Sequence, residues 1–147
     1  MNWFNIRVYG IYVEQGALLV TDEIRFGQRM TKLPGGGLEL GEGIEDCLKR
    51  EWLEELEAEV SVGDIVYVNP FFQPSAFRKT DQLICLYFMV KVHSPLKGIF
   101  SEIPQDFTSD GGDQQIFRWI PIRDLTEDIF TYPTDRALVP RLKQLHD

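Results

Sequence analysis

The sequence predicts an α+β fold in which a mixed β-sheet lies between helices. Two observations predict this class. Segments rich in β-branched and aromatic residues stand before and after one amphipathic helical segment, and a second helical pattern follows near the end of the chain. Such an order allows helices to bury the faces of a sheet. With 147 residues, the chain has the size of one domain, so a single domain over residues 1–147 is expected.

Strand patterns open the chain. Residues 4–13 and 17–21 carry the branched and aromatic side chains that strands favour. Glu14-Gln15-Gly16 between them is short enough for a hairpin turn. Residues 22–32 are predicted to form a polar connection. Residues 33–37 are predicted to form a loop, because one proline and three glycines disfavour regular structure.

More strands and a final helix are predicted in the second half of the chain. Residues 59–69, 83–92 and 116–120 have strand character, and the most apolar of them, 83–92, is expected to be a central strand buried on both faces. The stretch 94–112 is rich in Pro, Gly and polar residues and predicts a long loop. Residues 133–146 carry leucines at helical spacing and predict a last helix.

The central helix is predicted over residues 44–57 and has two distinct faces. Large apolar residues recur every four positions across 48–56 and mark the side that packs on the core. At about 100° per residue, Glu51, Glu54 and Glu55 lie within about 100° of one another on a neighbouring face. Such crowding costs a helix about 0.2–0.5 kcal/mol per pair, and carboxylates are the ligands that Mg²⁺ prefers. A run of Glu is also common on a solvated face, so spacing alone leaves both interpretations open.

The composition argues against several classes of partner. The formal net charge is −8 and the 15 Lys and Arg residues are scattered, so the basic stripe of a nucleic-acid-binding protein is missing. A small phosphate-bearing substrate remains compatible, since a metal ion can supply positive charge. No apolar run has the length of a membrane span or the pattern of a signal peptide, so a cytoplasmic location without a membrane partner is expected. Cys47 and Cys85 are expected to be small buried residues.

A glycine-rich segment runs into the central helix at fixed spacing. Gly36 is followed after five residues by Glu42 and, after seven more, by Arg50-Glu51-Trp52-Leu53-Glu54-Glu55. This pattern, over residues 36–58, resembles the Nudix box and keeps all of its charged positions. The resemblance implies a Nudix-like α/β/α sandwich. It also implies a metal-dependent hydrolase that cleaves a diphosphate linkage in a nucleoside triphosphate, ADP-ribose or a nucleotide sugar.

Two positions depart from the box. Glu57 stands where the family has Gly, and Ala58 stands where a larger aliphatic residue is usual. The glycine normally ends the helix in a left-handed cap, which costs a residue with a side chain about 1 kcal/mol. Either Glu57 carries this cost or the helix ends later. Both departures spare the charged groups, so activity is expected to persist.

The resemblance implies roles for the residues of the box. Arg50 is expected to orient a carboxylate, and Glu42 to support the loop or an outer metal position. Oxygen ligands for Mg²⁺ or Mn²⁺ are implied at four positions, namely Glu51, Glu54, Glu55 and the backbone carbonyl of Gly35.

Members of the family often add an acid from a late loop, before a strand that carries a Trp. Here that strand contains Trp119, and the acids before it are Asp110 and Asp113, of which Asp113 is favoured. A proton from the attacking water would pass to Glu51, Glu54 or Asp113, and the sequence leaves these three alternatives open. Many relatives are homodimers, which makes a second copy of the chain a possible partner.

Candidate substrate-binding residues lie outside the box. They are Phe72, Phe77, Arg78 and Arg29, with Tyr9 and Arg25 as further pocket positions. The Phe side chains of the loop 69–77 fit either a base-stacking surface or a core. The arginines fit either phosphate contacts or a solvated turn. Pro74 lies sixteen positions after Ala58, a spacing that resembles the ADP-ribose-hydrolysing subgroup.

Two other functions fit the same residues. A non-catalytic module that senses a nucleotide would keep the fold without turnover, although such sites usually lose ligands, and Arg50-Glu51 and Glu54-Glu55 are intact. An isomerase that acts on a diphosphate would normally need an added catalytic Cys, and Cys47 lies within the helix of the box.

Overall fold

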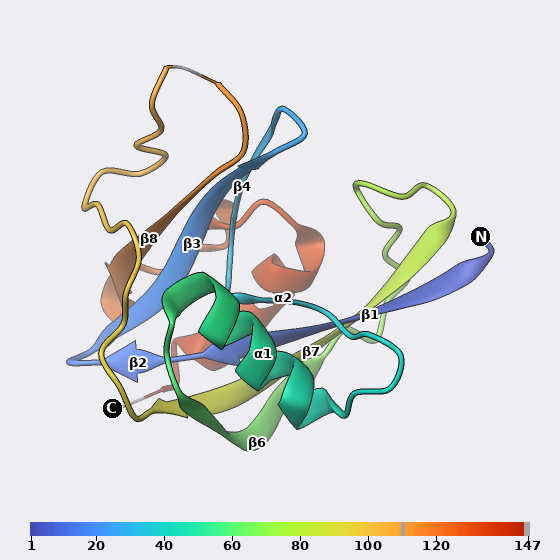
Figure 1. Cartoon of the computed structure of the whole chain (residues 1–147), viewed down its shortest axis with the longest axis horizontal. Coiled ribbons are helices and arrows are strands. Elements are labelled where there is room, and N and C mark those ends of the chain that lie inside the picture. Colours follow the sequence, from blue (N-terminus) through green and yellow to red (C-terminus); the bar gives the residue numbers. More distant parts are fainter. Residues whose placement is uncertain (110, 146–147) are drawn as a thin grey trace. The chain divides into compact units, whose positions relative to one another are not determined.

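The chain divides into two compact units. One contains Met1–Ile11 and Pro34–Leu96, and the other contains Tyr12–Leu33 and Lys97–Asp147. The computed structural model describes residues 1–109 and 111–145, which are shown as a ribbon in Figure 1. Asp110 and His146, the last residue of the predicted final helix, lie outside the described residues. Both units combine strands with helical segments, which confirms the α+β class.

The first unit contains a mixed sheet with the strand order β5-β1-β7-β6. Strand β1 (Trp3–Ile11) runs parallel to β7 (Asp81–Val92), whereas β5 (Gly35–Gly37) is antiparallel to β1 and β6 (Val60–Val68) is antiparallel to β7. Strand β7 therefore has the central position that its apolar sequence predicted. Many of its side chains are half-buried rather than buried on both faces.

Helix α1 (Ile44–Leu56) packs on this sheet and contacts β1, β5 and β6. Its apolar stripe is the predicted one, because Leu48, Trp52 and Leu56 are fully buried. Gly10 of β1 leaves room for the largest of them. A Cβ at Gly10 would lie 2.7 Å from Nε1 of Trp52, so only glycine fits between the strand and the helix.

The second unit contains an antiparallel sheet. In it β3 (Ala17–Arg25) pairs with each of the other strands, β2 (Val13–Glu14), β4 (Gln28–Lys32) and β8 (Gln114–Pro121). Two short 3₁₀ turns and helix α2 (Pro133–Leu142) follow β8. None of the helices within the described residues has the length and apolar character needed to cross a lipid bilayer.

The prediction of a polar connection over residues 22–32 is wrong. Strand β3 continues to Arg25, and the chain turns back at Phe26-Gly27 into β4. Both turn residues have positive φ, 50° and 76°, as two-residue hairpin turns require. A second hairpin therefore forms where the polar sequence predicted a connection.

Buried ion pairs explain why such polar residues form strands. Asp22 is fully buried and accepts hydrogen bonds from Nε and Nη2 of Arg118 at 2.9 and 3.0 Å. Glu23 is 3% exposed and lies 3.1 Å from Nζ of Lys32. Burial alone would raise the pKa of Asp22, but the hydrogen bonds from Arg118 and Thr31 outweigh it and lower that pKa.

The remaining elements agree closely with the predictions. The hairpin turn at Gln15-Gly16 is present, and β6 and β8 match the predicted strands to within two residues at each end. Helix α2 begins at Pro133 as predicted and ends at Leu142, before the expected end. In the described part of residues 94–112 there is no helix, and one isolated bridge joins Phe100 to β8.

Candidate active site

Three consecutive glycines form strand β5, where a loop was predicted. The prediction is wrong because these glycines pair with β1, in the register Val8↔Gly36. The lack of side chains lets neighbouring groups pack closely against β5. A Cβ at Gly36 would overlap the carboxylate of Glu51 and lie 2.7 Å from its Oε2. Real side chains do not approach so closely, so the absence of a side chain at Gly36 gives the Glu51 carboxylate its place beside β5.

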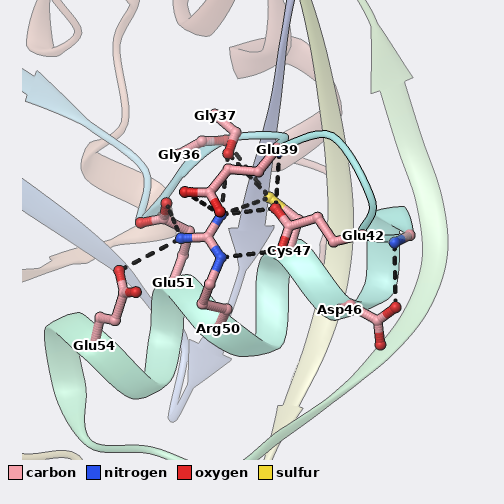
Figure 2. A network of polar contacts seen from close by, with 10 residues as sticks. Gly36, Gly37, Glu39, Glu42, Asp46, Cys47, Arg50, Glu51 and Glu54 are labelled. Carbon is pink, nitrogen blue, oxygen red and sulfur yellow. Dashed lines mark hydrogen bonds and ion pairs between the residues drawn. The ribbon is translucent and has the colours of Figure 1, made fainter.

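The guanidinium of Arg50 is the centre of the polar network on α1, as Figure 2 shows. Its Nε and Nη2 donate to the two oxygens of Glu42 at 3.0 and 2.7 Å. Its Nη1 donates to Glu51 at 2.9 Å and to Glu54 at 3.5 Å, and Nη2 donates to the carbonyl of Gly37 at 3.1 Å. Such a group fixes the direction of the Glu51 carboxylate and joins the helix to β5.

Glu42 holds the loop between β5 and α1. Besides the two bonds from Arg50, its Oε1 accepts the backbone N–H of Glu39 at 2.9 Å. These donors favour the charged carboxylate and lower the pKa of Glu42 to about 2. The pKa of Arg50 rises above its usual value, chiefly because of Glu42. The pair therefore stays ionised at neutral and mildly acidic pH.

The oxygen donors on α1 fit a hard divalent cation. Glu51 and Glu55 are half-buried, Glu54 is exposed, and Gly35 lies in β5 directly before Gly36. Within residues 1–109 and 111–145, no three His, Cys, Asp or Glu side chains already converge as a metal-binding cluster. In this structure Nη1 of Arg50 contacts both Glu51 and Glu54, so the two carboxylates share a cationic nitrogen.

Three of the predicted site residues, Asp113, Arg25 and Arg29, belong to the second unit and make their contacts there. Asp113 accepts the backbone N–H of Phe26 at 3.1 Å and lies 3.9 Å from Nη1 of Arg25. The guanidinium of Arg29 lies 5.3 Å from the ring centre of Phe107. Asp113 thus binds the turn of the β3–β4 hairpin, and Arg29 stacks on an aromatic ring of the late loop.

The aromatic loop between β6 and β7 belongs to the first unit. Phe72 is 58% exposed and Phe77 is 42% exposed, so these side chains do not fill a core. The backbone N–H of Arg78 donates to Oγ of Ser75 at 3.1 Å, and Pro74 forms an isolated bridge with the start of β7. The loop is tied to the sheet while its aromatic rings face outward.

Arg7, a half-buried residue of β1 that pairs with Gly37, was not predicted from the sequence. Its Nε donates to the hydroxyl of Tyr9 at 2.6 Å. A signal was present, because Asn5, Arg7 and Tyr9 alternate along a strand and therefore share one face. That alternation was hidden by the hydrophobic residues between them.

A strand of glycines packed against a helix that carries clustered carboxylates is the arrangement expected of a Nudix box. A family model described as the NUDIX domain matches residues 1–142. The chain therefore belongs to the Nudix family.

Solved structures share this fold at low sequence identity. The ORF135 protein of E. coli has a TM-score of 0.64 and 21% identity, with 97% of this chain and 88% of that chain covered. A MutT protein from Methanosarcina mazei has a TM-score of 0.66 and 18% identity, with coverage of 97% and 95%. An ADP-ribose pyrophosphatase from Streptococcus suis has a TM-score of 0.59 and 12% identity, with coverage of 97% and 94%. No curated protein matches the chain.

Proposed function

We propose that this chain is a metal-dependent hydrolase that cleaves a diphosphate linkage in a nucleoside triphosphate, ADP-ribose or a nucleotide sugar. The observation that carries the proposal is the seating of the Glu51 carboxylate against Gly36, with Glu54 on the next turn of the same helix. Nudix hydrolases generally use divalent metals such as Mg²⁺. The family model spans residues of both units, which supports a single Nudix domain over residues 1–147.

The side chains of the box have distinct tasks in this proposal. Arg50 holds Glu51 in one orientation, and Glu42 fixes Arg50 through two hydrogen bonds. Glu51, Glu54, Glu55 and the carbonyl of Gly35 would hold Mg²⁺ or Mn²⁺, which would lower the pKa of the attacking water and neutralise the diphosphate. Glu51, Glu54 or Asp113 would accept the proton of that water.

The exposed rings of Phe72 and Phe77 support a role in stacking a nucleobase, and Arg78 beside them supports a phosphate contact. Arg29 is a further proposed phosphate contact. The net charge of −8 supports a small-molecule substrate rather than a nucleic acid.

The cysteines argue against an isomerase. Burial and the neighbouring Glu42 raise the pKa of Cys47 to about 12, so its thiol stays protonated. Cys85 is buried as well. Both thiols are buried, and that of Cys47 is not acidic, whereas covalent chemistry requires an exposed, acidic thiol.

The decisive experiment incubates the protein with Mg²⁺ and nucleoside triphosphates, ADP-ribose, nucleotide sugars and dinucleoside polyphosphates, and measures the phosphates released. We expect cleavage of one class and a loss of about 100-fold or more in Glu54→Gln, which removes one charged oxygen ligand. Glu45→Gln, an exposed substitution on the same helix, is the control and keeps full activity. Nucleotide binding by calorimetry without any cleavage would instead identify a sensor and overturn the proposal.

A further inference from the structure

Strand β5 lies between two charged side chains, Glu51 beside Gly36 and Arg7 beside Gly37. Gly36 faces α1 and admits the carboxylate of Glu51. Its neighbour Gly37 pairs with Arg7 of β1, and successive residues of a strand point to opposite faces. A Cβ at Gly37 would lie 3.5 Å from Nη1 of Arg7, so the guanidinium packs on the backbone of β5, on the face away from α1.

Arg7 lacks the partner that a half-buried charge normally has. Its Nε is engaged by the Tyr9 hydroxyl, and its guanidinium carbon lies 5.7 Å from the centre of the Tyr9 ring. Among the residues that the structure describes, no carboxylate forms an ion pair with Arg7, and neither Nη1 nor Nη2 donates a hydrogen bond. Buried charges are usually paired, so Arg7 presents unused N–H donors and a positive charge that has no ion-pair partner among the described residues.

The position of Arg7 relates it to the Nudix box. Gly36 and Gly37 are consecutive, with Cα atoms about 3.8 Å apart, so Arg7 and Glu51 flank neighbouring residues of the same short strand. Strand β5 is the edge of its sheet, so within residues 1–109 and 111–145 no further strand of that sheet covers its outer side. The pKa of Arg7 is raised, chiefly by Tyr9 and to a smaller extent by Cys85 and Glu51, which keeps the group cationic.

We propose that Arg7 binds an anionic oxygen group of the substrate that continues from the scissile diphosphate around the edge of β5. A guanidinium presents parallel N–H donors that match a phosphate or a carboxylate. The group is either the third phosphate of a nucleoside triphosphate or a charged group on a linked sugar. Arg7 therefore selects substrates with a third anionic group. This inference rests on the proposed function for the position of the diphosphate.

Calorimetry in the presence of Ca²⁺ tests the inference without relying on turnover. The ligands form two matched contrasts: each nucleoside triphosphate against its diphosphate, and UDP-glucuronic acid against UDP-glucose. In the wild type, one contrast favours the ligand with the extra anion. Arg7→Met keeps the length of the side chain but loses its charge. In this variant the affinity preference falls about tenfold or more, the effect of losing a hydrogen bond to a charged group. The contrast that changes identifies the source of the anion.

Two further variants complete the test. Arg7→Lys keeps a positive charge and recovers part of the preference, which also covers the case that Arg7→Met fails to fold. Arg123→Met removes a charge from a side chain that is 85% exposed and behaves like the wild type. If neither contrast depends on Arg7, or if the wild type binds none of the ligands, the inference is overturned.

The outcome is separable from that of the proposed function. If hydrolysis depends on Glu54 but the anion preference does not depend on Arg7, only the role proposed for Arg7 is wrong. If the anion preference depends on Arg7 but the protein cleaves no substrate, only the proposed hydrolase activity is wrong.

Discussion

The Glu51 carboxylate occupies the space that a side chain at Gly36 would need. A Cβ at Gly36 would lie 2.5 Å from the carboxyl carbon of Glu51. Gly36 is not among the glycines with positive φ, so its backbone would accept another residue. The glycine that opens the Nudix box is therefore required by a carboxylate packed against it, and not by a turn.

Gly36→Ala is expected to reduce turnover by about 100-fold, because the new methyl group displaces the Glu51 carboxylate by a distance on the order of 1 Å. The melting temperature should fall only slightly, since the end of the Glu51 side chain can move. Steady-state kinetics on the substrate class found with the wild type measures the effect.

Gly37→Ala is the matched control for this substitution. A Cβ at Gly37 meets its nearest neighbour, Arg7, at 3.5 Å, which is an ordinary contact. This variant should keep turnover close to that of the wild type. Equal losses in the two alanine variants would show that β5 needs glycine for its backbone, and the explanation through Glu51 would fail.

Glu57→Gly is expected to stabilise the protein by about 1 kcal/mol. Helix α1 ends at Leu56, and Glu57 has φ 48° and ψ 32°, the left-handed conformation that glycine adopts more easily. Urea denaturation measures the free energy of unfolding. Glu57→Ala removes the carboxylate but keeps Cβ, so it separates backbone strain from the unfavourable charge at the helix end. A gain as large in Ala as in Gly would contradict the conformational explanation.

Stability should depend on pH through Glu42. Its pKa is about 2 in the folded protein against an ordinary value of 4.5, so folding favours the charged form. The contribution is complete above pH 4.5 and is lost as the pH falls through about 2. Glu42→Gln should therefore be less stable at neutral pH, and its deficit relative to the wild type should shrink in acid. Denaturation curves measure the free energy of unfolding of both proteins across this pH range. If the difference between them stays constant, the ion pair with Arg50 is not the cause.

The sequence predicted the Nudix box and its helix better than it predicted the strands. The spacing from Gly36 to Glu55 located the box, and the helix carries Arg50 and Glu51 as expected. The β3–β4 hairpin was missed, because strand prediction relies on apolar residues facing the core. Here Asp22 and Glu23 are buried instead with cationic partners.

Helix α1 and its face of carboxylates were determined by the sequence alone, because residues three or four positions apart share a helix face whatever surrounds them. The tertiary structure alone decided that Gly35–Gly37 forms a strand and that Arg7 lies opposite Gly37. It also brought Arg118 to Asp22, 96 positions away along the chain. Strand pairing and buried ion pairs join distant residues, and local patterns do not contain the information that selects such partners.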